Sequence, residues 1–300
     1  MKDQSSVASR IATSETLRRE ASSVNRPVLI RWRRAVLHGT LLIGVALLAF
    51  PFVWMILTSF KTYQETIQIP PTVFPHVWQL HNYADAWKAA NFPRFFLNSI
   101  GTSFAAVAGA LLTSVLAAYA FAYMDFFGKN VLFVLFLSTM MIPFETILIP
   151  DFIIIRQLHW YNTYAALIVP WTANVFSMFL VRQFFLGLPR DLAEAAVIDG
   201  CGHQTFLWWV AVPLARPAIT VVALFNFLWN WNSLLWPLIV TSDESMRPIQ
   251  LGLSVFLTEN GTYYQLLMAA ATFTMLPIVI LYLIAQREFI DGIATGSVKG

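Results

Sequence analysis

The chain has 300 residues, of which 58% are apolar and only 12% are charged, and its formal net charge is +3. A soluble domain carries about 25% charged residues, so the composition excludes a soluble protein and predicts an all-α integral membrane protein. The single cysteine, Cys201, excludes an internal disulfide and a multi-cysteine metal site. Basic residues form no patch typical of nucleic-acid binding, so we expect no nucleic-acid partner.

The N-terminal segment 1–35 is polar and basic and is predicted to be a flexible cytosolic tail. The apolar run at 36–58 is too long for the core of a signal peptide, which indicates a retained first span. Prolines and tryptophans in residues 59–93 favour an ordered external segment with aromatic side chains at the membrane interface.

Five further apolar runs bring the predicted number of transmembrane helices to six, within a membrane domain at 36–300. With both termini in the cytosol, the cytosolic segments hold fourteen Lys and Arg residues and the external segments hold five. Positive residues concentrate on the cytosolic side, so we predict an N-in/C-in topology with the loop 187–208 in the cytosol. The further predicted spans are 95–123, 131–155, 163–186, 209–237 and 266–286.

Small residues recur at every fourth position of the second predicted span, in two neighbouring rows. Such rows let helices approach closely in lipid, where small faces drive helix packing. We therefore expect this helix to be central in the bundle. The rows are Ala106, Ala110, Ser114, Ala118 and Ala122, and Ala105, Gly109, Thr113 and Ala117.

The third and fifth predicted spans carry polar side chains that lipid would penalise. Pro143 and Pro150 should bend or break the third span, and Glu145 lies near its external end. That carboxylate either lines a transport pathway or pairs locally at the interface. In the fifth span, Asn226 and Asn230 lie one helical turn apart beside Trp229 and Ser233. Amides next to aromatic rings suit sugar binding, but they equally suit hydrogen bonds between helices.

A short helix is predicted between the fourth and fifth spans, opened by Pro189 and ended by Gly200. About ten residues make it ~15 Å long, which is half of a bilayer crossing. Leu192, Ala195 and Ala196 share one face of it, and that small face suits a groove on a partner. Its charged residues also exclude burial in lipid: Arg190, Asp191, Glu194 and Asp199.

The same loop resembles the EAA loop of ABC-importer permease subunits. The family pattern is Glu-Ala-Ala, three residues, Gly, nine residues and Ile-x-Leu-Pro. Here Glu194-Ala195-Ala196, Gly200 and Val210-x-Val212-Pro213 keep that spacing, with Val in place of Ile and Leu. Asp199-Gly200 is similar to the common Asp-Gly variant.

Other short motifs over residues 36–300 resemble the carbohydrate branch of this family, the maltose-type, MalG-like permeases. The chain ends in Val-Lys-Gly after a glycine-rich tail, as those subunits do. The remaining similar motifs are Asn98-Ser99, Ala118-Tyr119-Ala120-Phe121, Met141-Ile142-Pro143 and Trp236-Pro237-Leu238.

The resemblance implies a type I importer fold and the permease subunit of an ATP-driven, binding-protein-dependent sugar importer in the bacterial inner membrane. Implied partners are a second permease subunit, a cytosolic ATPase dimer, an extracytoplasmic solute-binding protein and membrane lipid. Glu194, Ala195, Ala196 and Gly200 would carry the coupling to the ATPase. Asp199 would orient the loop, and Pro213 would set the start of the fifth span. Candidates for the substrate pathway are Glu145, Asn226, Trp229 and Asn230.

The chain lacks a G-x-x-x-x-G-K-[ST] phosphate loop, so ATP and Mg²⁺ are expected in the partner ATPase and no cofactor in this chain. No G-x-S-x-G elbow or H-E-x-x-H motif indicates an enzyme. A permease for a non-sugar solute and an ion-coupled secondary transporter remain as alternatives. The ion-coupled transporter predicts repeated halves and ionisable residues at mid-membrane. Glu145 is the one candidate for such an ionisable residue.

Overall fold

A computed structural model describes residues 26–258 and 261–297. The chain divides into two compact units, with the boundary between Leu57 and Thr58. Four of the described helices are long and apolar enough to cross a membrane, and six spans result if each of two sharply bent helix pairs is one span. The terminal motif Val298-Lys299-Gly300 and the tail residues 1–25 lie outside the described residues.

The first unit contains one long helix, α2 (Arg26–Ser59). Its candidate span is Arg33–Ser59, and the helix begins well before the predicted start at residue 36. Pro51 lies inside the helix. Its side chains are largely exposed, as Leu42 and Leu48 illustrate at 69% and 75%. An apolar helix exposed to this degree is suited to lipid or to another apolar helix.

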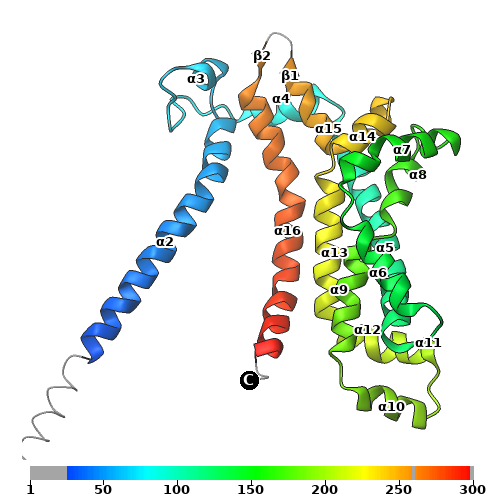
Figure 1. Cartoon of the computed structure of the whole chain (residues 1–300). Helices are drawn as coiled ribbons and strands as arrows, with labels where there is room; N and C mark the ends of the chain where they lie inside the picture. Colours follow the sequence, from blue (N-terminus) through cyan, green and yellow to red (C-terminus); the bar gives the residue numbers. More distant parts are fainter. Residues whose placement is uncertain (1–25, 259–260, 298–300) are drawn as a thin grey trace, which may run out of the picture. The chain divides into compact units, whose positions relative to one another are not determined.

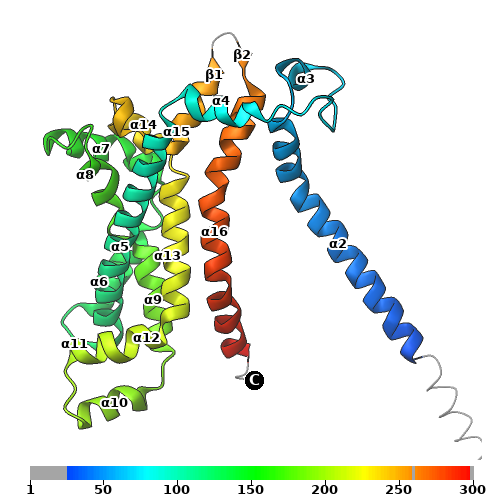
Figure 2. The same ribbon diagram turned by 180° about the vertical axis from the view of Figure 1, so that it is seen from behind.

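The second unit is a helical bundle with one two-stranded antiparallel ribbon (Figures 1 and 2). Its first half contains α3 (Tyr63–Ile67), α4 (His81–Ala89), α5 (Phe92–Tyr123), α6 (Lys129–Thr139), α7 (Phe144–Gln157), α8 (Tyr164–Ile168), η1 (Val169–Trp171) and α9 (Val175–Leu186). The second half contains α10 (Arg190–Ile198), α11 (His203–Phe206), η2 (Leu207–Ala211), α12 (Val212–Leu214), α13 (Arg216–Trp231), α14 (Leu235–Val240), η3 (Glu244–Met246), α15 (Ile249–Leu253), η4 (Ser254–Phe256), β1 (Leu257–Thr258), β2 (Gly261–Thr262) and α16 (Tyr264–Ser297).

Helix α5 is the central packing element of the bundle, as its small-residue rows predicted. It packs on α9 and α13, and also on α4, α8, η1 and α15. Four members of the first row are fully or almost fully buried: Ala106, Ala110, Ser114 and Ala118. From the second row, the Thr113 hydroxyl donates to the Thr172 carbonyl oxygen at 2.6 Å.

Gly109 marks the closest approach between α5 and the segment that follows η1. A Cβ there would lie 2.5 Å from Thr172 Cγ2 and 2.8 Å from Thr172 Cβ. We expect Gly109→Ala to destabilise the protein by roughly 1–3 kcal/mol, because the packed segment must shift. Gly101→Ala is the matched control in the same helix, since no atom lies within 4 Å of its Cβ position. Thermal unfolding midpoints in detergent measure both, and equal midpoints would refute the close contact.

The third and fifth predicted spans are broken rather than straight. Helices α6 and α7 meet at 99°, with Pro143 at the break as the N-cap of α7. Proline there lacks an N–H donor and disfavours a helical preceding residue, so the predicted break has its expected cause. Pro150 instead stays inside α7. The pair α11–α12 and α13 meet at 79°, so the helix begins at Arg216 and ends at Trp231 rather than spanning 209–237.

The segments at the α4 end of the bundle are held by hydrogen bonds to the start of α5. The Asn98 amide donates to the carbonyl oxygens of Ser245 and Arg247 at 2.8 and 3.0 Å, and its Oδ1 accepts from the Tyr164 hydroxyl at 2.8 Å. Ser99 Oγ accepts from the Ile249 N–H at 2.7 Å. The Asn98-Ser99 pair therefore fixes the segment that leads into α15 against α5.

Glu65 is buried and holds together the segment that leads into α4. Its carboxylate accepts from the N–H and hydroxyl of Thr62 at 2.8 and 3.0 Å and from the His76 N–H at 2.7 Å. Burial alone would raise the pKa of Glu65, but these hydrogen bonds outweigh it and lower the pKa below its ordinary value. Burial also lowers the pKa of Lys61, partly offset by the Glu65 carboxylate.

This capping predicts acid sensitivity of residues 62–76. Because the folded pKa of Glu65 is depressed, its stabilising effect is complete above the unfolded value of about 4.3 and is lost as pH falls through the folded pKa. Hydrogen-exchange protection of the segment should therefore fall below about pH 4. In Glu65→Gln, protection should be lower at neutral pH and should not change across the acid range. An acid transition that persists in this variant would assign it to another group.

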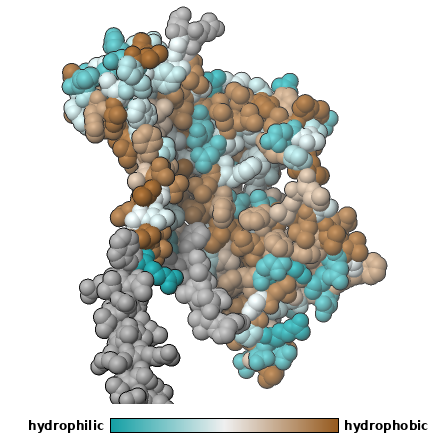
Figure 3. All heavy atoms as spheres, turned by 60° about the vertical axis from the view of Figure 1, so that its left-hand side comes forward, coloured by the Kyte–Doolittle hydropathy of each residue, from teal (hydrophilic) through white to brown (hydrophobic). Residues whose placement is uncertain are grey.

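Much of the visible face in Figure 3 is hydrophobic. Large apolar side chains are exposed along the bundle, including Val131 at 65% and Ile284 at 69%. In water such a surface would promote aggregation, whereas in a membrane it can contact lipid or another apolar subunit. The surface therefore agrees with helices that cross a membrane.

Candidate functional site

Helix α10 lies at the end of the bundle opposite α7, α8 and α14 (Figures 1 and 2). Pro189 is its N-cap, as the sequence predicted, and Asp199 is its C-cap, one residue before the predicted end at Gly200. Gly200 follows with φ of +74°, and its N–H donates to the Val197 carbonyl oxygen at 3.0 Å. This left-handed residue closes the helix, and glycine adopts it without strain.

The exposed face of α10 differs from the predicted one. Glu194 and Ala195 are exposed, and Val197 and Ile198 are exposed at 71% and 86%. Ala196 instead packs with Ala193 against the protein's own core, so the prediction that it shares a partner-facing surface with Leu192 and Ala195 is wrong. The rotation of the helix is set by its contacts with the bundle and not by its local sequence.

The α10 region is joined to the bundle by a hydrogen bond and borders a pocket. Tyr119 Oη and His203 Nδ1 lie 2.9 Å apart, which joins α5 to α11. Between α10 and α5 lies a pocket of 330 Å³, lined by Tyr119, Tyr123, Ala193, Ala196, Val197, Cys201, Gly202, His203 and Phe206. The loop thus rests on the end of α5 through small side chains.

Pro213 does not begin the helix α13, in contrast to the prediction. It lies within the short helix α12, after the π-helical turn η2, and Pro217 instead occupies the first turn of α13. The Val212 N–H donates five residues back, to the Leu207 carbonyl oxygen. Because proline cannot donate and clashes with the carbonyl four residues earlier, the turn widens just before Pro213.

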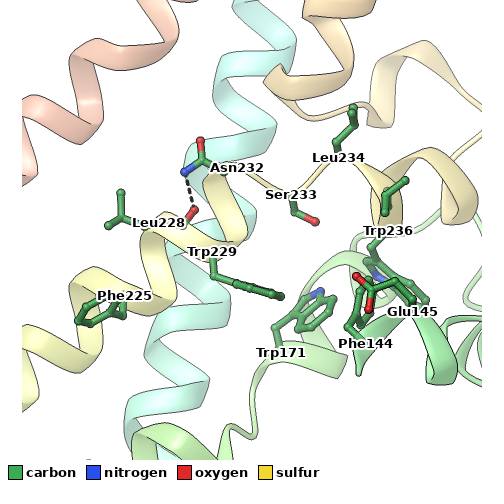
Figure 4. A pocket seen from close by; sticks show the side chains of 11 residues that line it. Phe144, Glu145, Trp171, Phe225, Leu228, Trp229, Asn232, Ser233, Leu234 and Trp236 are labelled. Atoms are coloured by element: carbon green, nitrogen blue, oxygen red, sulfur yellow. Dashed lines mark hydrogen bonds between the residues drawn. The ribbon is translucent and has the colours of Figure 1, made fainter. Parts of the chain in front are cut away.

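A second candidate site is a pocket of 510 Å³ formed by α7, η1, α13 and α14 (Figure 4). Trp236 is buried, and its indole N–H donates to the Ala166 carbonyl oxygen at 2.8 Å. Trp171 packs at 90° against Trp236, with ring centroids 6.1 Å apart, and also contacts Phe144. Trp229, exposed at 58%, extends from α13 toward Trp171 (Figure 4). Trp171 and Trp236 thus form a packed wall of the pocket, whereas the Trp229 ring is exposed.

The structure brings Glu145 and Trp229 into this one pocket, together with Ser233. Within the described residues, no hydrogen bond or ion pair uses the Glu145 carboxylate, the Ser233 hydroxyl or the indole N–H groups of Trp171 and Trp229. Asn232 is different, because its amide donates to Leu228 and accepts from Gln250. The unused groups provide acceptors and donors beside aromatic faces.

Asn226 and Asn230 do not line this pocket. Asn226 is buried, and its amide donates to Ser177 Oγ on α9 at 2.8 Å and to the Val222 carbonyl oxygen at 2.8 Å. Asn226 also lines a smaller pocket of 280 Å³ with Trp229. Asn230 donates to the Asn226 carbonyl oxygen at 2.9 Å. Asn226 thus forms a hydrogen bond between helices, as the structural alternative predicted, whereas the Asn230 amide bonds within α13.

The fold and these sites define a polytopic helical membrane protein with a short, largely exposed helix at one end and an aromatic pocket toward the other. Residues 109–293 match the family model described as the binding-protein-dependent transport system inner membrane component. The chain belongs to that family. It is accordingly a multi-pass inner-membrane protein and a transport permease subunit rather than an enzyme.

Characterised relatives cover most of the chain. The arabinooligosaccharides transport system permease protein of Halalkalibacterium halodurans is 37% identical over 88% of this chain and 98% of its own length. The sn-glycerol-3-phosphate transport system permease protein of Yersinia enterocolitica is 34% identical, covering 85% and 94%. The diacetylchitobiose uptake system permease protein of Streptomyces coelicolor is 30% identical, covering 88% and 89%.

The fold also matches a solved structure. A bacterial ABC transporter involved in the import of the acidic polysaccharide alginate has a chain that superimposes with a TM-score of 0.76 at 22% identity. The match covers 86% of this chain and 97% of that chain. At this identity the similarity establishes a shared ABC-importer permease fold.

Proposed function

We propose that this chain is the membrane-spanning subunit of an ATP-driven importer of a sugar or oligosaccharide. The observation that carries the proposal is its 37% identity, over nearly the full length of both proteins, to a permease named for arabinooligosaccharides. A second relative is named for diacetylchitobiose. The aromatic pocket with unused hydrogen-bonding groups is of the kind that holds sugars.

The proposed topology has six spans with both termini in the cytosol. The two bent pairs, α6–α7 and α11–α13, each count as one span in this arrangement. The excess of Lys and Arg in the cytosolic segments, fourteen against five outside and eight of them in the tail 1–35, supports the orientation. Helix α10 then faces the cytosol, and the Glu145 pocket lies toward the external side.

In this proposal α10 transmits ATPase movements to the membrane helices. A second permease subunit completes the pathway, a cytosolic ATPase dimer holds ATP and Mg²⁺, and a solute-binding protein delivers the sugar from outside. Glu194 and Ala195 contact the ATPase, while Ala196 seats α10 on the chain's own core. Asp199 and Gly200 fix the turn that follows, and Pro213 shapes the segment between α10 and α13. Movements of the ATPase at the cytosolic end then shift the equilibrium between two global conformations of the membrane helices.

For the substrate pathway, we propose that Glu145 and Trp229 contact sugar directly. Asn226 and Asn230 act as positioning residues, because their amides fix α13 against α9 and along its own axis. This division assigns the contact role to the residues whose polar groups the protein leaves unused.

A non-sugar solute is the second candidate, favoured by the 34% identity to permeases named for sn-glycerol-3-phosphate. That ligand is an anion, and the described part of the pocket holds a carboxylate and no basic residue. The negative charge of Glu145 would repel this anion, so the pocket favours a neutral sugar over sn-glycerol-3-phosphate. An ion-coupled secondary transporter gains no support, because the family to which the chain belongs is that of binding-protein-dependent transport systems.

Co-purification of the tagged chain from its own membranes tests the proposal. We expect an ATPase and a second permease subunit to accompany it, and sugar uptake by vesicles containing the complex to require ATP. Solute uptake by the chain alone, without ATP, would contradict it. Uptake of sn-glycerol-3-phosphate in place of any oligosaccharide would favour the second candidate.

A further inference from the structure

The Glu145 pocket carries one negative charge, which can discriminate between neutral and anionic sugars. Of its eleven lining residues, Glu145 is the one with an ionisable side chain, and the rest of the described lining is aromatic, aliphatic or neutral polar. No Lys, Arg or His in the described part of the chain pairs with Glu145. Glu145 is exposed at the pocket, and an unpaired carboxylate there repels anions that approach the aromatic walls.

The neutral groups of the pocket also fit a sugar without negative charge. The indole N–H groups of Trp171 and Trp229 can donate to hydroxyl oxygens, and Glu145 can accept from hydroxyl or ammonium groups. Ser233 can do either. Aromatic rings line the pocket (Figure 4), and their faces suit the C–H faces of sugar rings. A volume of 510 Å³ falls within the range of small-molecule sites, about 300–1,000 Å³.

We propose that this pocket makes the chain selective for neutral or amino sugars and that Glu145 is the residue that rejects phosphorylated and uronic sugars. The inference rests on the proposed sugar import and adds the charge of the substrate. It also distinguishes this chain from its structural relative, a transporter involved in the import of an acidic polysaccharide.

The experiment uses a cysteine reporter inside the pocket of the assembled importer. The sole native cysteine is replaced by Cys201→Ser, and either Ser233→Cys or Leu234→Cys is introduced, so that one failed variant leaves a second reporter. Cationic and anionic methanethiosulfonates of similar size then react with the thiol. Their rates are divided by their rates with 2-mercaptoethanol to remove intrinsic reactivity.

With Glu145 present, the cationic reagent should react about tenfold faster than the anionic one. Glu145→Gln should bring the ratio close to one, and Glu145→Asp should keep it high because the charge remains. Equal rates with Glu145 intact would overturn the inference without any further variant. A ratio that survives Glu145→Gln would also overturn it, since another group would then set the potential.

Protection by saccharides tests the substrate class in the same samples. Cellobiose and deacetylated chitobiose should slow the labelling of the reporter, whereas digalacturonate should do so only in Glu145→Gln. Protection by digalacturonate with Glu145 intact, or by none of the three, would overturn the charge selectivity. ATP-driven sugar uptake by the same vesicles reports the proposed function separately, so its presence alongside a failed protection assay would refute only the charge inference.

Discussion

Replacing Gly200 with valine is expected to lower ATP-driven uptake about tenfold, with the protein still inserted in the membrane. Gly200 has a φ of +74°, and a Cβ placed there would meet no heavy atom within 4 Å. The effect should therefore come from backbone strain, about 1–3 kcal/mol for a non-glycine residue in this region. To relieve that strain, the turn after α10 must change and move the helix that we propose docks on the ATPase.

Gly202 provides the matched control for this prediction. It lies two residues further along, has a φ of −75°, and also has no atom within 4 Å of its Cβ position. Gly202→Val should therefore retain uptake and co-purification of the ATPase, and Gly200→Asn should restore much of the loss, because asparagine tolerates left-handed backbone. If Gly200→Val binds the ATPase and transports like the parent chain, α10 is not the coupling element.

The ends of α10 could be predicted from the sequence, but the face that it turns to the core could not. Pro189 and Gly200 act through their own backbone preferences, which the sequence carries directly. The face that α10 turns to the core depends on residues that are distant in the chain, such as Tyr119. The role of Pro213 was misassigned for a related reason. A second proline, Pro217, follows a few residues later, and only the tertiary bend shows that Pro217 is the one in the first turn of α13.

The aromatic pocket shows a second limit of sequence reasoning. Glu145 was a candidate because a carboxylate in an apolar run is conspicuous, and Trp229 because it lies beside two asparagines in the same run. Trp171 and Trp236 were missed, because the pocket joins four elements that only the tertiary fold brings together. The aromatic run that ends at Trp236-Pro237 was a usable signal for one of them. Trp229 and Trp231 lie two residues apart in α13 and so point to nearly opposite sides of the helix, and the sequence alone does not show which side is buried.

Trp229→Ala should lower sugar uptake about tenfold, which corresponds to about 1.4 kcal/mol of lost binding, while leaving the thermal unfolding midpoint unchanged. The side chain is exposed at 58% and lines the pocket, so its removal opens no cavity in the core. Uptake and unfolding are measured on the same purified complex, with the sugar that its binding protein delivers.

Trp231→Ala is the matched variant in the same helix, and it should show the opposite pattern. Trp231 is fully buried, stacks on Phe227 at 5.4 Å and donates its indole N–H to the Thr274 carbonyl oxygen at 3.0 Å. Its loss should cost about 3–5 kcal/mol of stability. If Trp229→Ala instead lowers the unfolding midpoint as Trp231→Ala does, its ring supports the fold rather than the sugar. Equal uptake in Trp229→Ala and the parent chain would remove Trp229 from the pathway.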